Sequence, residues 1–236
     1  MLSRYLIPLA VAAALATPLA ANAAQGDWLF RVGLSQVNPK EENLQIDLGE
    51  PVGNAFIVVD SDISPTFNIT YMLTDHIGTE LLAAWPFTHG IDLKPYSGGG
   101  ERIAYVDHLP PTLSLQWHFN PNGTWRPYVG AGINYTMFSS EETRGAFNGT
   151  KLKLEDSFGP AAQVGVDIGV SQNWFVNLDV RWIDIDADAE LNGGEIGTVE
   201  IDPMVYGVHV GYKFGKPAPT PVPVAAPAPA PAPAPA

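Results

Sequence analysis

The 236-residue sequence contains no cysteine, few basic residues and, after its first residues, no long apolar run. Without cysteine, disulfides cannot contribute to stability in an oxidising compartment. Twelve Lys and Arg against 25 Asp and Glu give a formal net charge of −13, which argues against nucleic-acid binding because that needs a basic surface. No stretch after residue 23 reaches the roughly 18 consecutive apolar residues of a membrane-spanning helix.

The first 23 residues have the features of a secretory signal peptide. Arg4 supplies a positive start, an apolar stretch covers residues 5–15, and residues 21–23 (Ala-Asn-Ala) fit a small-residue cleavage site. We expect cleavage after Ala23 and export to the cell envelope.

The other end of the chain, residues 215–236, consists almost entirely of Pro and Ala. Proline at alternate positions prevents helix formation and removes the hydrogen-bond donors that a sheet needs. We therefore predict an extended, disordered periplasmic tail. Residues 24–214 remain as one domain without an internal linker.

What the sequence does contain is an alternation of apolar and other residues that restarts eight times, in runs of about ten residues. In the last run, one face comprises Met204, Tyr206, Val208, Val210, Tyr212 and Phe214, and the other Gly207, His209, Gly211 and Lys213. A period of two indicates an extended strand with two different environments. No predicted helices are present to cover these apolar faces, whereas a closed barrel in a lipid bilayer leaves them facing outward.

Three short turns and four long polar segments connect the eight runs, the long ones at 38–61, 88–107, 139–157 and 187–200. Short turns at one end and long loops at the other are typical of outer-membrane barrels. Aromatic residues adjoin the short-turn end, as in an interfacial girdle: Trp28, Trp117, Phe119, Trp174, Tyr212 and Phe214. We predict an all-β fold, an eight-stranded antiparallel transmembrane β-barrel in a Gram-negative outer membrane. The alternative, a soluble sandwich or lipocalin-like barrel, leaves the outward aromatic faces unexplained.

Five blocks of sequence occur in a recognisable order: TYMLTDHIGTELLAAWPF (70–87), HLPPTLSLQW (108–117), RPYVGAGINYT (126–136), DIDADA (184–189) and VGYKF (210–214). In these blocks the chain resembles the outer membrane protein W (OmpW) family of eight-stranded barrels, from Gly26 to Phe214. The resemblance implies a role as an uptake route for small hydrophobic molecules. One feature differs, because in such barrels the final aromatic residue usually ends the chain, and here the tail follows Phe214.

Strand parity places a group of ionisable residues inside the barrel, near its periplasmic end. Nearly balanced charges at one level of a narrow barrel predict an ion-paired plug rather than an ion pathway. An eight-stranded lumen is filled by side chains or holds at most a small ligand. The predicted plug comprises Arg31, Glu80, Arg126, Asp167, Asp179, Arg181 and Lys213.

The inward positions nearer the outside are mostly apolar, and two interpretations stay open. The side chains either pack the barrel, or they form an apolar funnel that is open to the outside and shut below. From such a funnel a hydrophobic solute leaves only sideways, into the membrane. The predicted solute path comprises Leu82, Ala84, Pro86, Tyr128, Phe138, Ile183 and Val205.

A sideways exit requires a weak seam in the barrel wall. Proline lacks the N–H that a ladder needs and is confined to strand edges or bulges. Pro65, Pro86 and Pro110 lie toward the outer halves of three successive predicted strands. We predict the seam there, with the alternative that these prolines only end pairing near the loops.

The sequence predicts no enzymatic site. Ser114 and His118 both face inward, but four residues along a strand separate them by roughly 13 Å, too far for a nucleophile and its base. His209 with Asp179 or Asp167 has the composition of a base and its orienting group, and the plug accounts for these residues equally well. No cofactor is expected.

Four acids, Asp184, Asp186, Asp188 and Glu195, occupy positions 1, 3, 5 and 12 of a calcium-loop pattern. The sixth position, normally glycine, is Ala189, and a strand rather than a helix precedes the segment. We therefore predict no specific metal site, and expect these acids to lie near the lipopolysaccharide level, where divalent cations bridge to phosphates.

The leading functional prediction is passive, non-enzymatic passage of small hydrophobic compounds through the upper lumen with lateral release. The alternative is a structural or surface-interaction protein that acts through its extracellular loops. Expected partners are outer-membrane lipids and lipopolysaccharide, small hydrophobic solutes and the barrel-assembly machinery. A continuous apolar cavity in the upper lumen favours transport, and a filled one favours the alternative.

Overall fold

The computed structural model describes residues 23–40, 44–47, 54–95 and 98–215. All but the last residue of the expected signal peptide, and all but the first residue of the Pro/Ala tail, lie outside these residues. No helix in the described part of the chain is long and apolar enough to cross a membrane.

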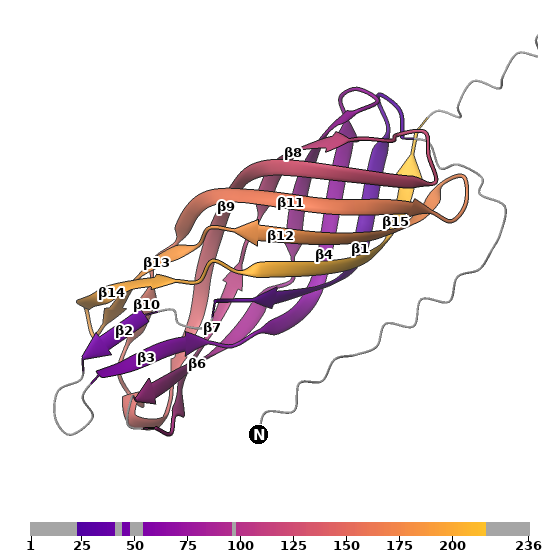
Figure 1. The fold of residues 1–236 in the computed structure, drawn as a ribbon. Coiled ribbons are helices and arrows are strands. Elements are labelled where there is room, and N and C mark those ends of the chain that lie inside the picture. The colour runs from indigo at the N-terminus through magenta and orange to yellow at the C-terminus, as the bar shows by residue number, and fades with distance from the viewer. Residues whose placement is uncertain (1–22, 41–43, 48–53, 96–97, 216–236) are drawn as a thin grey trace, which may run out of the picture.

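Eight antiparallel strands form a closed barrel, as predicted (Figure 1). In chain order they are β1 (Trp28–Asn38), β4 (Asp62–Met72), β5 (Ile77–Ala84), β8 (Thr112–His118), β9 (Trp125–Thr143), β11 (Ser157–Gly169), β12 (Trp174–Ile183) and β15 (Met204–Phe214). Pairing of β11 with β9 closes the circle. The first and last barrel strands also pair, with Trp28 opposite Phe214, so no strand edge of the barrel is left open.

The outer surface of the barrel is a belt of exposed apolar side chains. Large apolar residues on all eight barrel strands are exposed, from Met137 at 36% to Phe158 at 68%. A soluble protein would bury such a continuous surface, whereas a barrel in lipid leaves it outside. Aromatic residues are exposed at both levels of the belt, for example Trp174 near the short turns and Trp85 at the opposite level.

The four long segments, expected to be loops, largely continue as strands. These are β2 (Leu44–Asp47), β3 (Asn54–Val59), β6 (Phe87–Pro95), β7 (Glu101–Leu109), β10 (Leu152–Leu154), β13 (Asp186–Leu191) and β14 (Gly194–Glu200). We call these seven strands the extracellular extension. The loop prediction was wrong because polar outer faces concealed the alternation of apolar inner residues, such as Ile91 and Leu93.

The extension consists of two sheets that are not joined to each other by a ladder. Strands β2, β3, β6 and β7 continue the barrel sheet beside β9, whereas β10, β13 and β14 form a separate three-stranded sheet. Figure 1 shows both groups at the end that is remote from the short turns. A 3₁₀ helix, Gly145–Phe147, lies in the same region.

The extension projects beyond the apolar belt. Within its described residues, Ile196 is the sole large apolar side chain that is exposed. Its inner faces, in contrast, form the main apolar core of the molecule, which includes Ile57, Ile91, Ile103 and Val199. The belt marks the membrane level, and the extension lies outside it.

Candidate functional site

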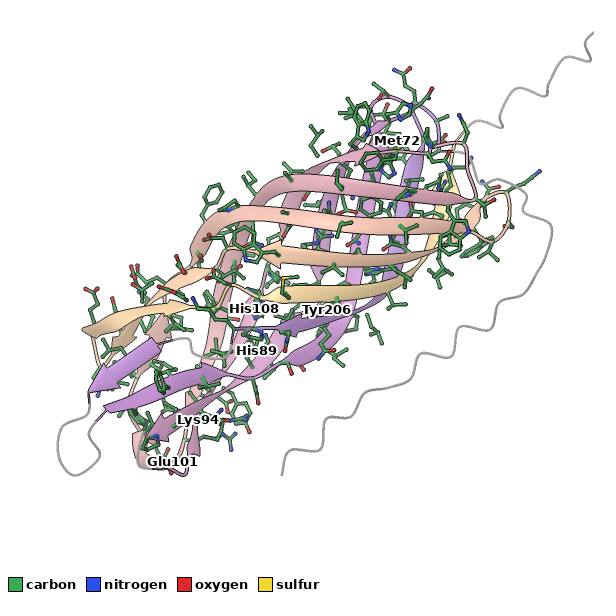
Figure 2. All side chains as sticks on the ribbon, in the orientation of Figure 1. Met72, His89, Lys94, Glu101, His108 and Tyr206 are labelled. Carbon is green, nitrogen blue, oxygen red and sulfur yellow. The ribbon has the colours of Figure 1, made fainter. Side chains whose placement is uncertain are left out.

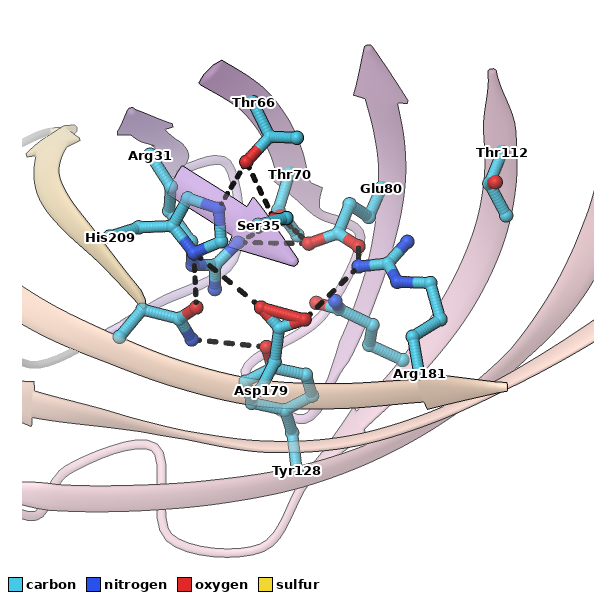
Figure 3. Close-up of polar contacts among 12 residues, drawn as sticks. Arg31, Ser35, Thr66, Thr70, Glu80, Thr112, Tyr128, Asp179, Arg181 and His209 are labelled. Atoms are coloured by element: carbon cyan, nitrogen blue, oxygen red, sulfur yellow. Dashed lines mark hydrogen bonds and ion pairs between the residues drawn. The ribbon is translucent and has the colours of Figure 1, made fainter. Parts of the chain in front are cut away.

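The lower half of the lumen is closed by a network of ion pairs, which we call the plug (Figure 3). Glu80 on β5 accepts from two guanidinium groups, Arg31 Nη1 at 3.1 Å and Arg181 Nη2 at 3.0 Å. Asp167 on β11 lies 2.9 Å from Arg31 Nη2 and 3.6 Å from Arg126 Nη2. All five side chains are fully buried or nearly so, so the lumen is blocked at this level.

Asp179 on β12 belongs to the same network, at longer distances. Its carboxylate lies 3.8 Å from Arg181 Nη2 and 3.5 Å from His209 Nδ1. His209 Nε2 in turn lies 2.8 Å from the Thr66 hydroxyl. Six of the seven residues predicted for the plug therefore lie together, with His209 added to them.

Lys213, the seventh, lies apart from the network and contacts Asp27 at 3.7 Å. As the next-to-last residue of β15, it lies below the other charges, at the mouth of the barrel. Beneath the plug lies an apolar floor, in which the Phe175 ring is 5.5 Å from the Arg31 guanidinium and 5.0 Å from that of Arg126. Sequence reasoning missed Phe175, although its inward parity on β12 could have identified it.

Tyr128, predicted on the solute path, is part of the plug instead. It is buried, and the Arg31 guanidinium lies 5.6 Å from its ring centre. Its hydroxyl accepts from Asn177 Nδ2 at 3.0 Å. The prediction was wrong because Tyr128 lies in the periplasmic half of the long strand β9, only three residues after its first residue.

Above the plug lies a buried polar layer that includes Thr112, Asn134 and Thr136, and beyond this layer the interior is mainly apolar. Leu82, Ile183 and Val205 are buried, and Ala84 and Phe138 pack against the apolar core of the extension. The core encloses one cavity of about 40 Å³, lined by residues that include Ile103, Phe147, Leu191 and Val199. A second cavity of about 10 Å³ lies below it, and Val59, Ile91 and Leu154 line both. We call this interior the upper chamber.

Pro86, also predicted on the solute path, is exposed, and Phe87 points inward in its place. Leu82 pairs with Thr112, and Phe87 pairs with His108. Between these two pairs, four residues (83–86) on one side face three (109–111) on the other. The additional residue reverses the parity, so that the inward positions are even-numbered on β5 and odd-numbered on β6. Strict alternation could not anticipate this shift.

The same region contains a gap in the barrel wall. No residue of 83–86 pairs with one of 109–111 among the described ladders, and Pro86 and Pro110 flank this gap. Pro65, in contrast, is tied to its neighbour, because its carbonyl accepts from the Trp85 N–H at 2.8 Å. Of the three prolines predicted to mark a seam, two border the gap and Pro65 lies on the bonded side.

Two buried histidines lie at the base of the upper chamber (Figure 2). The rings of His89 on β6 and His108 on β7 stack with centres 4.8 Å apart, and Phe87 and Phe138 flank them. Burial in this apolar setting lowers the pKa of His89 and lowers that of His108 well below its ordinary value. Both rings are therefore neutral at pH 7. Sequence reasoning missed them because His89 falls in segment 88–107, which was expected to be a loop, and His108 directly follows that segment.

The side chains considered for catalysis are buried in the lower lumen. His118 is buried, and its Nε2 lies 3.1 Å from the Gln116 amide oxygen rather than beside a nucleophile. His209 contacts Asp179 and Thr66 within the plug, below the upper chamber.

The four acids of the calcium-loop pattern do not converge. Asp184 and Asp186 instead meet Asp202, with carboxylate oxygens within 4.8 Å of one another. The Lys40 ammonium contacts Asp202 at 3.1 Å and also bonds to Glu200, so a cation from the chain itself balances this cluster. Asp188 accepts from the Thr198 hydroxyl at 2.7 Å.

A closed eight-stranded barrel with an outward apolar belt, a plugged lower lumen and an extension beyond the belt defines an outer-membrane β-barrel protein. Comparisons with known proteins agree. The model of the OmpW family matches residues 24–214. Outer membrane protein W of Escherichia coli K12 is 40% identical over 217 residues, which cover 87% of this chain and 99% of that protein.

Two further relatives are informative. The crystal structure of the outer membrane protein OprG from Pseudomonas aeruginosa superposes with a TM-score of 0.72 at 33% identity, over 84% of this chain and all of that one. The dibenzothiophene metabolism operon protein PahQ of Pseudomonas aeruginosa is 26% identical over 200 residues, 81% of this chain and 90% of that protein. The chain belongs to the OmpW family, and it is a protein of the cell outer membrane.

Proposed function

We propose that the barrel passes small hydrophobic molecules from the cell exterior into the outer membrane. Solutes enter the upper chamber through the extension, are stopped by the plug, and leave sideways at the gap between Pro86 and Pro110. The observation that carries this proposal is the vertical order of the interior, an apolar chamber above a fully buried ionic network, with unpaired wall beside the base of the chamber.

Each part of this order has a physical consequence. An uncharged apolar molecule gains free energy when it moves from water into a space lined by Ile, Val, Leu and Phe. It cannot continue downward, because that requires breaking buried ion pairs without replacing them. The bilayer is the remaining apolar environment. The gap offers a route to it that breaks no ladder, because the residues joining β5 to β6 do not pair with those joining β7 to β8.

The cavities of about 40 Å³ and 10 Å³ are smaller than such a solute, so the chamber must widen. Its walls allow this. Among the described strands, the sheet β10-β13-β14 shares no ladder with β2-β3-β6-β7, so the two parts can separate without breaking a ladder between them. An apolar solute replaces apolar contacts between them as it enters. The relative PahQ is named for a dibenzothiophene metabolism operon, and dibenzothiophene is an apolar aromatic compound, which is consistent with solutes of this kind.

The first test is whole-cell uptake of labelled alkanes or aromatics with and without the protein. We expect faster uptake with it, and no difference would contradict the proposal.

The lateral route is tested with a disulfide across the gap. The chain has no cysteine, so Trp85→Cys with Leu109→Cys gives a single cross-link. As a control, Thr79→Cys with Leu115→Cys links β5 to β8 below the gap, where these strands are paired. We expect the first cross-link to stop uptake until it is reduced, and the second to have no effect. Unchanged uptake with the first cross-link formed would exclude this exit.

The alternative, a structural or surface-interaction protein, is favoured by one observation, the small volume of the cavities. Under that alternative, the packed extension presents a rigid outer surface to lipopolysaccharide or to other cells. It predicts that deleting the gene leaves uptake unchanged, so the uptake comparison separates the two functions.

A further inference from the structure

The base of the upper chamber holds one polar atom whose hydrogen-bonding state can be assigned. His89 Nδ1 lies within hydrogen-bond distance of the Asp60 backbone carbonyl. A carbonyl oxygen only accepts, so Nδ1 carries the proton and donates it. In the neutral ring, Nε2 is then unprotonated and is an acceptor only.

This acceptor is buried and has no partner among the described residues. His89 is only 4% exposed, and its ring stacks on His108, which is 5% exposed. Both rings line the lower cavity of the chamber together with Val59, Ile91, Phe138 and Leu154. Because its other neighbours in the cavity are apolar, Nε2 gains a hydrogen bond only from a molecule that enters the chamber.

The position of the pair relates it to the exit. His89 follows Pro86 by three residues, and His108 precedes Pro110 by two, so both flank the gap in the wall. A solute held at His89 therefore has its polar end at the base of the chamber, beside the gap, and its apolar part among the residues above.

We propose that His89, stacked on His108, is a binding subsite for a hydrogen-bond donor on an otherwise apolar solute. The preferred solutes are then medium-chain alcohols and phenols rather than hydrocarbons or ethers of the same size. This inference rests on the proposed function of the chamber and names its substrate class. An ether offers only lone pairs, which cannot bond to an unprotonated nitrogen, whereas a hydroxyl donates to it.

Uptake of two isomers tests the preference. 1-Octanol and heptyl methyl ether have the same atoms, but the alcohol alone is a donor; n-nonane serves as the hydrocarbon. For each, the protein-dependent rate is the whole-cell uptake with the protein minus that without it. We expect His89→Phe, which keeps an aromatic ring and removes Nε2, to lower the alcohol-to-ether ratio by about two- to tenfold, the range expected for one net hydrogen bond. Uptake of n-nonane should change little.

His76→Phe is the matched control, because it replaces a histidine ring that stacks on Trp117 and lies in the short turn between β4 and β5, at the other end of the barrel. This variant should leave the alcohol-to-ether ratio unchanged.

A second measurement uses the wild-type protein and so does not require any variant to fold. In the wild-type protein in phosphatidylcholine nanodiscs, the ¹⁵N resonance of His89 Nε2 should shift on addition of 1-octanol and not on addition of heptyl methyl ether.

The outcomes separate this inference from the proposed function. One outcome overturns the subsite and leaves transport standing: n-nonane is taken up, the alcohol-to-ether ratio is equal in the wild type and His89→Phe, and no ¹⁵N shift is seen. A resident water that already donates to Nε2 would give this same outcome, and it would likewise overturn the subsite. A ¹⁵N shift specific to 1-octanol, without protein-dependent uptake of any of the three compounds, supports the subsite and contradicts transport.

Discussion

At the scale of single residues, Glu80 is the centre of the plug. It is fully buried and contacts Arg31 and Arg181 at 3.1 and 3.0 Å, so each carboxylate oxygen bonds to a different guanidinium. Arg31 also contacts Asp167, and Arg181 also lies near Asp179. Such a network blocks the lumen without leaving an isolated charge, which burial would make very costly.

We expect Glu80→Gln to destabilise the barrel by about 3–5 kcal/mol, because it leaves two buried guanidinium groups undercompensated. Denaturant unfolding in lipid bilayers measures the change. Glu155→Gln is the matched control, since its pair with Lys153 is half exposed and should contribute less than about 1 kcal/mol. Glu80→Gln should also open no large conductance in planar bilayers, because the neighbouring side chains still fill the lumen. Stable porin-like currents from it would show that the plug is a gate.

At the scale of elements, β6 and β7 carry the stacked histidines into the apolar interior of the extension. Burial lowers the pKa of both rings, and the charge of His108 is further opposed by His89. Asp60 and Asp62 oppose the shift at His89 but do not reverse it. Opening the extension exposes the rings and lets their pKa values return to the ordinary value near 6.5.

The pH dependence of local opening follows from this sign. Below pH 6.5 the open state binds more protons than the closed state. The closed state is therefore most stable above pH 6.5, and its stability relative to the open state decreases as the pH falls. Each histidine contributes at most about 1.4 kcal/mol per pH unit. Hydrogen-exchange protection of β6 and β7 should therefore be lower at pH 5 than at pH 8, after correction for the intrinsic rate. A variant with both His89→Phe and His108→Phe should lose this dependence, and equal dependence in the two proteins would assign it to other groups.

At the scale of the whole molecule, closure depends on the ends of the domain. β1 and β15 pair along their full lengths, from Trp28–Phe214 to Asn38–Met204, and this pairing completes the barrel before the Pro/Ala tail begins.

We expect deletion of Pro217–Ala236 to leave folding and uptake intact. Insertion should be as efficient or better, because Phe214 then lies close to the chain end. Gel mobility of unheated samples reports folding, and the octanol and nonane assays report transport. A truncated barrel that inserts normally but no longer takes up solute would show that the tail participates in function.

The sequence by itself determined the barrel. A period of two in eight runs, with aromatic residues at the short-turn end, has one stable solution in lipid, because every backbone polar group must be paired internally. Parity along each strand then indicated six of the seven plug residues, since inward and outward positions alternate strictly in a regular ladder. The acidic composition and the absence of cysteine excluded some classes of function, but they did not indicate where a functional site lies.

The tertiary structure alone decided the upper half. Whether the long polar segments are loops or strands depends on pairing with distant partners, such as β3 with β6, which local patterns do not encode. The extra residue near Pro86 reverses the inward parity and brings Phe87 and His89 into the chamber, a change visible only when both strands are aligned. The gap, the stacked histidines and the unpartnered Nε2 all follow from that register, because burial and pairing are properties of the assembled sheet.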